Sequence, residues 1–155
     1  MAAGKVKLYE NGKKHLADGT FDLDTNTFKI SLHTSASNAN ALATSNVFAD
    51  ITNELTTANG YTAGGIALSS VTWTNTSGSM AWTFAAVVWT ASGAGITARF
   101  AVIRASGTLN GLIDPILGVF LLDATPADVS ASAGNTLTVT PSGSGAFTLS
   151  GATTD

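Results

Sequence analysis

The chain has 155 residues, no cysteine and a formal net charge of -3. This length fits a single domain with a substantial core. The lack of cysteine excludes disulfides and thiolate metal sites, and the acidic balance argues against a nucleic-acid partner. No apolar run approaches the roughly 18 residues that cross a bilayer, and the start of the chain has no signal-peptide pattern. We therefore expect a soluble, unprocessed protein without a membrane partner.

Charged residues are scarce in this chain. They make up 11% of it, against about a quarter in an ordinary globular domain. From Leu55 to Ile113 the only formal charges are Arg99 and Arg104. Disorder is not expected, because 45% of the residues are hydrophobic. The composition favours a chain whose neutral surface lies against other subunits; the alternative is a β-domain that simply has a neutral surface.

The N-terminal part is predicted to hold a short strand and a short helix. Val6 and Leu8 alternate with lysines, which is typical of an edge strand whose lysines point outward. Glu10 to Ala17 can form about two helical turns. Asp18-Gly19 then predicts a turn.

Residues Phe21 to Leu32 predict a hairpin, or two closely joined strands, with one solvated face. Apolar and polar residues alternate from Phe21 to Leu23 and from Phe28 to Leu32. Thr25-Asn26 between them has the composition of a tight turn. Thr34 to Ser45 follows as a polar loop of small residues.

The chain is organised around a predicted helix at about 46–59. Val47, Ile51 and Leu55 recur every four residues and would form one apolar stripe. Asn59-Gly60 would end this helix, because its residues readily adopt the left-handed conformation. After Gly64-Gly65 the apolar residues recur at every second position, so strands are expected there.

The remainder of the chain is predicted to be a series of strands. Ala85-Ala86 interrupts the apolar rhythm, and a bulge there would return Val87 and Trp89 to the inside. The apolar side chains of residues 96–102 would share one face, with Arg99 on the reverse. Ile116 to Leu122 is apolar on both faces, which is typical of a strand covered on both sides. The strands are expected at 71–74, 80–84, 87–89, 96–102, 116–122, 128–132, 136–140 and 147–149, with a loop at 106–111.

Together these elements predict one β-rich domain over residues 1–155. Strands at a spacing of roughly ten residues with turns between them are typical of an antiparallel β-sandwich or barrel. The expected fold is therefore mainly β, with one short α-helix at about 46–59 and a second helical turn near the N-terminus. Residues 1–4 and 151–155 are expected to be flexible.

Candidate metal ligands and catalytic residues are few. His15 and His33 have polar neighbours in the sequence and are predicted to lie on the surface. Asp22 to Asn26 imitates the start of a calcium loop, but the glycine and the closing glutamate of that loop are both missing. Asp50 and Glu54 have the spacing of a carboxylate pair, yet acids on one helix face are usually its solvated side.

Other motifs also fail to define a site. No G-x-S-x-G elbow or phosphate-binding loop is present, and Asn75-Thr-Ser77 is a glycosylation sequon only in a secreted protein. Five aromatic residues could form a sugar-binding platform, but their inward parity favours core packing. These five are Trp73, Trp82, Phe84, Trp89 and Phe100. We therefore predict no catalytic, cofactor-binding or metal site, and no enzyme activity.

Six short segments follow one another in a characteristic order between residues 5 and 104. They are KLYENGKKHL at 7–16, GTFDLDTNTFKISL at 19–32, FADITNEL at 48–55, GYTAGG at 60–65, VVWTA at 87–91 and ITARFAVI at 96–103. As a set they resemble a widespread family of small virion structural proteins of tailed bacteriophages. Members of that family usually carry more acids where this chain has Ala81 to Val87. The region after Leu112 matches only in general character.

The resemblance implies a non-enzymatic component of a phage particle. We expect a decoration or cement protein on the outer surface of the head. Its expected partners are the major capsid protein and copies of itself in a homotrimer. From the charge distribution we place the trimer contacts in the charge-poor region Leu55 to Ile113 and the capsid contacts at the charged terminus, Lys5 to Lys14. No functional residue is carried over, because no defined site is associated with the family.

Two other functions compete with this expectation. The protein could serve in the tail or baseplate, since neutral β-sandwiches serve there too. It could also be a carbohydrate-binding module that docks on host glycans through its tryptophans or loops. An enzyme is the least expected class.

Overall fold

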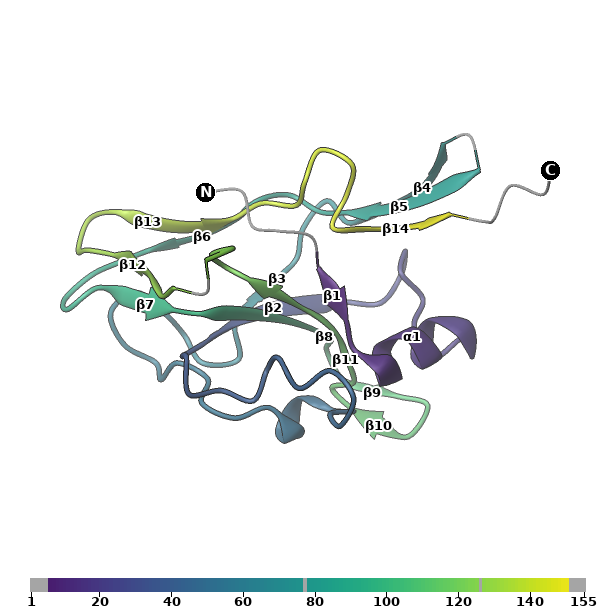
Figure 1. Ribbon diagram of the computed structural model, residues 1–155, viewed down its shortest axis with the longest axis horizontal. Coiled ribbons are helices and arrows are strands. Elements are labelled where there is room, and N and C mark those ends of the chain that lie inside the picture. The colour runs from purple at the N-terminus through teal and green to yellow at the C-terminus, as the bar shows by residue number, and fades with distance from the viewer. Residues whose placement is uncertain (1–5, 77, 126, 151–155) are drawn as a thin grey trace.

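The structure, a computed structural model, describes residues 6–76, 78–125 and 127–150. The predicted flexible ends, 1–4 and 151–155, lie outside these ranges. The fold is mainly β, as predicted, with antiparallel strand pairs and one α-helix (Figure 1). The described strands form sandwich-like layers and no closed barrel. No helix among the described residues is long and apolar enough to span a membrane.

A five-stranded antiparallel sheet lies at the centre of the molecule. Its strand order is β1-β11-β8-β2-β3. The strands are β1 (Lys7–Leu8), β2 (Phe28–His33), β3 (Ile66–Ala67), β8 (Phe100–Ala105) and β11 (Ile116–Leu121). β1 is an edge strand with an exposed lysine, as predicted. β11 is an inner strand that is almost completely buried, which confirms the prediction made from its two apolar faces.

A second β layer packs on one face of the central sheet (Figure 1). It contains a three-stranded sheet, β14-β5-β4, and the pair β13-β6, while β12 pairs with β7 beside them. These strands are β4 (Thr72–Thr76), β5 (Ser79–Thr83), β6 (Val87–Thr90), β7 (Ile96–Ala98), β12 (Val129–Ala131), β13 (Thr136–Val139) and β14 (Phe147–Ser150). Val87 and Trp89 point to the interior, as predicted, but a break between β5 and β6 at residues 84–86 returns them there and not the predicted bulge.

The buried side chains form two clusters, one on each face of the central sheet. The upper core lies against the second β layer and contains Phe28, Trp82 and Phe120. The ring centroids of Phe28 and Trp82 are 5.2 Å apart. The lower core contains Ile51 and Val102 and is covered by the segment 34–58, which runs below the sheet in Figure 1. Successive residues of β8 therefore alternate between the two cores.

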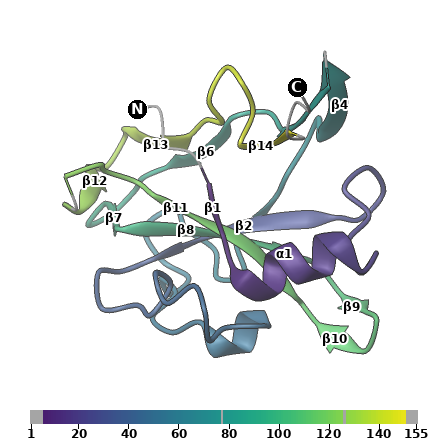
Figure 2. The ribbon, with the colours of Figure 1, turned by 45° about the vertical axis from the view of Figure 1, so that its right-hand side comes forward.

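The short N-terminal helix was predicted correctly. α1 (Glu10–Ala17) covers the two expected turns. Figure 2 shows it running across the central sheet beside β11, and the amide of Tyr9 at its start donates a hydrogen bond to the carbonyl of Leu117 (3.1 Å). Gly12 is buried at this contact, so the helix backbone approaches β11 closely.

The predicted helix at about 46–59 is wrong. Only a short 3-10 turn, η1 (Phe48–Asp50), forms there, and the backbone is already extended at Ile51. Asn53 has a φ of 55°, which no helix accommodates. Asn59-Gly60 does adopt the left-handed conformation, with φ values of 54° and 89°, but it forms a tight turn between extended residues and ends no helix.

The four-residue spacing in this segment arises from three separate long-range partners. Val47 forms an isolated bridge with Pro115, and Ile51 enters the lower core. Leu55 packs against the upper core, and its amide donates to the carbonyl of Leu32 (2.9 Å). Tertiary contacts therefore outweigh the local helical period.

The predicted hairpin over Phe21 to Leu32 is also wrong. Phe21 and Leu23 are buried, but the chain between Asp22 and Asn26 forms a turn and residues 21–23 form no strand. β2 pairs instead with β3 and β8, which come from distant parts of the sequence. The alternation at 21–23 reflects two side chains reaching the core from a turn.

Two strand predictions in the second half need correction. The run 96–102 is interrupted at Arg99, whose amide donates to the carbonyl of His33 (2.8 Å). Ala98 and Phe100 consequently enter different cores and do not share a face. The predicted loop 106–111 contains β9 (Thr108–Leu109), which pairs with β10 (Leu112–Ile113) in a small hairpin.

Substitution of Gly12 should reveal how closely α1 approaches the sheet. A Cβ at this position would clash with the backbone carbonyl of Leu117, so we expect Gly12→Ala to lower the free energy of unfolding by about 1–3 kcal/mol despite the better helix propensity of alanine. Urea unfolding followed by circular dichroism measures this change. Gly143→Ala is the control, because open space surrounds that glycine; equal stability of the two variants would contradict the close packing.

Candidate functional site

The described residues contain no group of three or more histidines and acids that could hold a metal ion. The prediction that His15 and His33 lie on the surface is wrong, because their exposed fractions are 4% and 0%. Both are too deeply buried to meet a ligand from solution. Each side chain instead satisfies polar groups inside the fold.

His33 lies in β2 between a hydroxyl and a backbone carbonyl. Its Nδ1 is 3.1 Å from the carbonyl oxygen of Thr52, which can only accept, so Nδ1 carries the proton. Nε2 then accepts from the Ser31 hydroxyl at 3.0 Å. Burial lowers the pKa of His33 below its usual value of 6.5. The pair resembles a nucleophile with its base, but Ser31 is also fully buried, so no substrate can reach it.

His15 connects α1 to the segment that follows the polar loop. Its Nε2 lies 2.8 Å from Oδ1 of Asn46, and its ring packs edge-on against Phe21 with centroids 5.4 Å apart. Nδ1 is 3.9 Å from a carboxylate oxygen of Asp18. This histidine therefore joins a helix, a turn and a loop.

Asp50 and Glu54 do not form a carboxylate pair, because the helix that would align them is absent. Asp50 accepts hydrogen bonds from the amides of Asn46 and Val47 at 2.7 and 3.0 Å, and these bonds lower its pKa. Glu54 faces a different set of donors. The two acids therefore stabilise separate turns.

Glu54 belongs to a buried polar network that we call the Arg104 clamp, formed by Phe48, Glu54, Tyr61, Gly64 and Arg104. One carboxylate oxygen of Glu54 accepts from the Tyr61 hydroxyl at 2.7 Å and from the Gly64 amide at 2.6 Å. The Gly64 carbonyl accepts from both terminal nitrogens of Arg104 at 3.2 Å. The Arg104 guanidinium lies 3.9 Å from the centre of the Phe48 ring.

Both arginines of the charge-poor region are paired inside the molecule. Arg104 is 5% exposed, and its Nε lies 3.6 Å from a carboxylate oxygen of Asp114. Arg99 donates to Asp128 at 2.8 Å. Neither arginine leaves an uncompensated charge on the surface between Leu55 and Ile113.

The outer face of the second β layer, which we call the threonine face, carries no formal charge. Its side chains alternate with residues that point to the inner side of the layer, and most of them are small or hydroxylated; cross-strand neighbours include Thr72 opposite Thr83 and Thr90 opposite Thr136. Val88, with an exposed fraction of 47%, is a large apolar residue on this face. The threonine face comprises Thr72, Thr74, Ser79, Ala81, Thr83, Val88, Thr90, Thr136, Thr138 and Thr148.

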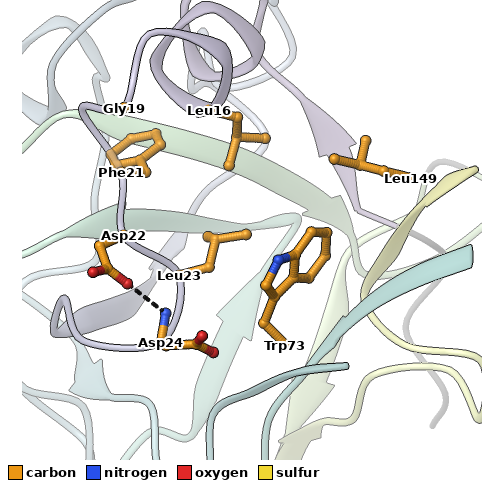
Figure 3. A pocket seen from close by; sticks show the side chains of 8 residues that line it. All are labelled: Leu16, Gly19, Phe21, Asp22, Leu23, Asp24, Trp73 and Leu149. Atoms are coloured by element: carbon orange, nitrogen blue, oxygen red, sulfur yellow. Dashed lines mark hydrogen bonds between the residues drawn. The ribbon is translucent and has the colours of Figure 1, made fainter. Parts of the chain in front are cut away.

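Four of the five aromatic residues considered as a platform are core residues. Trp82, Phe84, Trp89 and Phe100 are all less than 10% exposed, which confirms core packing for them. Trp73 differs, because it is only partly buried and lines a groove of about 420 Å³ (Figure 3). Asn75 of the sequon is exposed on β4, and Ser77 lies outside the described residues.

The Trp73 groove lies between the inner side of the second β layer, the end of α1 and the turn after it. Its apolar walls come from Leu16, Leu23, Trp73 and the 44% exposed Leu149, and two aspartates stand on one side (Figure 3). Asp22 accepts from the amides of Asp24 and Thr25 at 3.0 and 3.1 Å. The segment that imitated a calcium loop is thus a turn closed by its own carboxylate.

A second hollow, of about 440 Å³, lies beside η1 and the β9-β10 hairpin. Phe48 and Leu112 contribute to its apolar lining, and Ile113 is 69% exposed at its edge. Neither this hollow nor the Trp73 groove was predicted from the sequence, because each combines segments that are distant in the chain. For the Arg104 clamp, the sequence does contain one local indication. Arg104 is a single cation within an apolar run, and such a residue needs partners inside the fold.

Comparisons with models of protein families, with curated proteins and with solved structures find no match.

Removal of the Tyr61 hydroxyl should weaken the Arg104 clamp. This hydroxyl donates to Glu54 and accepts from the buried amide of Leu32 at 3.1 Å, so Tyr61→Phe leaves an amide without an acceptor and should cost about 1–3 kcal/mol in urea unfolding. Tyr9→Phe is the matched control, because its hydroxyl makes one bond, to the Ala39 carbonyl. A smaller cost for Tyr61→Phe than for the control would contradict the role given to the clamp.

Acid should destabilise the fold by charging His33. Burial lowers its folded pKa below 6.5, so the neutral ring is favoured in the folded chain and the unfolded chain binds the proton more readily. The stabilisation is complete above about pH 6.5 and is lost as the pH falls through the folded pKa. NMR titration of the ring should give a His33 pKa below 6.5 while the free energy of unfolding decreases; a value at or above 6.5 would refute this account.

Proposed function

We propose that this protein is a non-enzymatic virion structural protein of a tailed bacteriophage, a decoration or cement protein that binds the outer surface of the head. The observation that carries this proposal is the charge-free threonine face. Its ten side chains come from β4, β5, β6, β13 and β14. The ordered sequence segments that resemble phage virion proteins support the same class.

A neutral, hydroxyl-rich sheet face is suited to permanent contact with other subunits. Charges brought into an interface lose their hydration, which costs free energy unless each is paired. The centres of protein interfaces are accordingly depleted of charged residues. The threonine face can be covered without that cost, and Val88 adds apolar area within it.

The proposed assembly is a homotrimer that contacts the major capsid protein. Closed symmetry allows copies of the threonine face and its flanking strands to cover one another. The exposed lysines Lys7, Lys13 and Lys14 lie on β1 and α1, away from the threonine face, and supply a charged surface for the capsid. A protein that binds only the intact shell stabilises it by mass action, by about 2.7 kcal/mol per site at a hundred times its Kd.

A tail or baseplate position is the runner-up, because the same neutral face would serve in either assembly. The two positions predict different defects in particles that lack the protein. Loss of a cement protein leaves shells that leak under osmotic shock, and addition of the purified chain restores them. Full, stable heads that fail to adsorb to cells would instead place the protein in the tail.

The self-association can be tested with a single lysine on the threonine face. Light scattering after size-exclusion chromatography should give three times the chain mass of 15.6 kDa. Val88→Lys should weaken association at least about tenfold, because each copy would bury an unpaired ammonium group.

The matched control is Ala17→Lys, an exposed position at the end of α1. This variant adds the same charge outside the threonine face and should associate like the unmodified chain. A stable monomer that also does not bind empty phage shells would contradict the cement proposal. Equal weakening by both lysines would show that the threonine face is not the contact.

A further inference from the structure

We infer that the Trp73 groove is a binding site for a neutral pyranose sugar. The inference is independent of shell binding, since a particle component can carry a ligand site besides its assembly contacts. The groove has a volume of about 420 Å³, within the range of about 300–1,000 Å³ that is usual for small-molecule sites. Its size therefore suits one or two sugar rings.

The walls of the groove match the apolar face of such a ring. Leu16 and Leu149 lie above the indole of Trp73 and Leu23 lies beside it in Figure 3. Leu149 is 44% exposed, and Trp73 is the one tryptophan of the three that is not fully packed in the core. Part of the Trp73 ring already packs against Phe147, with ring centroids 5.9 Å apart. A pyranose presents a broad C–H face that can cover the part of the indole that stays exposed and remove both surfaces from water.

The polar groups of the groove match the edge of the ring. The Asp24 carboxylate points to the Trp73 side of the groove in Figure 3, and no described residue donates a hydrogen bond to it. The indole nitrogen of Trp82 donates to the Leu23 carbonyl at 3.4 Å, whereas that of Trp73 faces the Leu23 and Asp24 side of the groove in Figure 3. A ligand is thus offered one free acceptor and one free donor, and sugar hydroxyls can satisfy both because they donate and accept.

A lysine or arginine side chain fits the groove less well. Asp22 is already occupied by the amides of Asp24 and Thr25, so one free carboxylate remains, and it stands in water. Exposed ion pairs of that kind contribute little.

The test is a titration of the full chain with methyl glycosides of glucose, galactose, mannose and N-acetylglucosamine, followed by tryptophan fluorescence. Trp82 and Trp89 are 0% and 2% exposed, so a change on binding reports Trp73. At least one glycoside should give a saturable change with a Kd on the order of 1 mM, as expected for a ligand of this size.

Asp24→Ala should weaken this binding at least tenfold. Only the backbone amide of Asp24 supports the turn, so the fold should be unchanged by circular dichroism. Asp128→Ala, which removes a carboxylate bound to Arg99, should leave the Kd unaltered. Trp73→Phe removes the fluorescent reporter, so its affinity is measured by NMR titration with the same glycoside; it should retain part of the affinity, because phenylalanine keeps a smaller aromatic face and loses the indole donor.

Three outcomes would overturn the assignment. One is the absence of a saturable change with every glycoside. Another is saturation by N-acetyl-lysine amide while the glycosides have no effect, which would make the groove a cation site. The third is glycoside binding that Asp24→Ala does not weaken, which would place the ligand elsewhere on the protein.

Discussion

The interior position of the Arg104 guanidinium is the constraint on which the lower half of the molecule depends. β8 carries this charge into a site that is 5% exposed, and a buried cation is tolerated only when it has several partners. Its partners are the Phe48 ring of the covering segment at 3.9 Å, the Gly64 carbonyl at 3.2 Å and the Asp114 carboxylate at 3.6 Å. Loss of one partner of a buried charge costs about 3–5 kcal/mol. The segment that a helix was expected to occupy is therefore held as an extended lid over the lower core.

That lid determines how the rest of the chain is distributed. Because an irregular segment covers one face of the central sheet, the second β layer has only the other face to cover, and its outer side remains free. The inner side of this layer buries Trp82 and Phe147, whose ring centroids are 5.6 Å apart. Beyond that packed area the same inner side reaches Leu149, which is 44% exposed. The neutral threonine face and the Trp73 groove are thus opposite sides of one layer, which allows assembly and ligand binding to occupy separate surfaces.

The sequence predicted those elements whose patterns are produced locally. α1 and the strands that contain Val87, Leu117 and Leu137 follow local alternation or helical period, and they form where expected. The helix predicted at 46–59 does not form, because Ile51 and Leu55 belong to different cores. Their four-residue spacing reflects two separate tertiary contacts. The prediction that His15 and His33 lie on the surface failed, because polar neighbours in the sequence do not reveal buried partners such as Asn46 and Thr52. The Trp73 groove could not be predicted, since Leu16 and Leu149 lie at opposite ends of the chain.

The internal pairing of charges also sets the kind of recognition that this protein can perform. Arg99 and Arg104 each have an aspartate partner, so the strands between Leu55 and Ile113 generate little electric field outside the molecule. Long-range steering, which depends on net surface charge and is screened by salt, is consequently weak for the threonine face. Its contacts must gain their free energy from area, shape and hydroxyl hydrogen bonds at short range. Such contacts gain further strength wherever many copies are held close together by repeated sites.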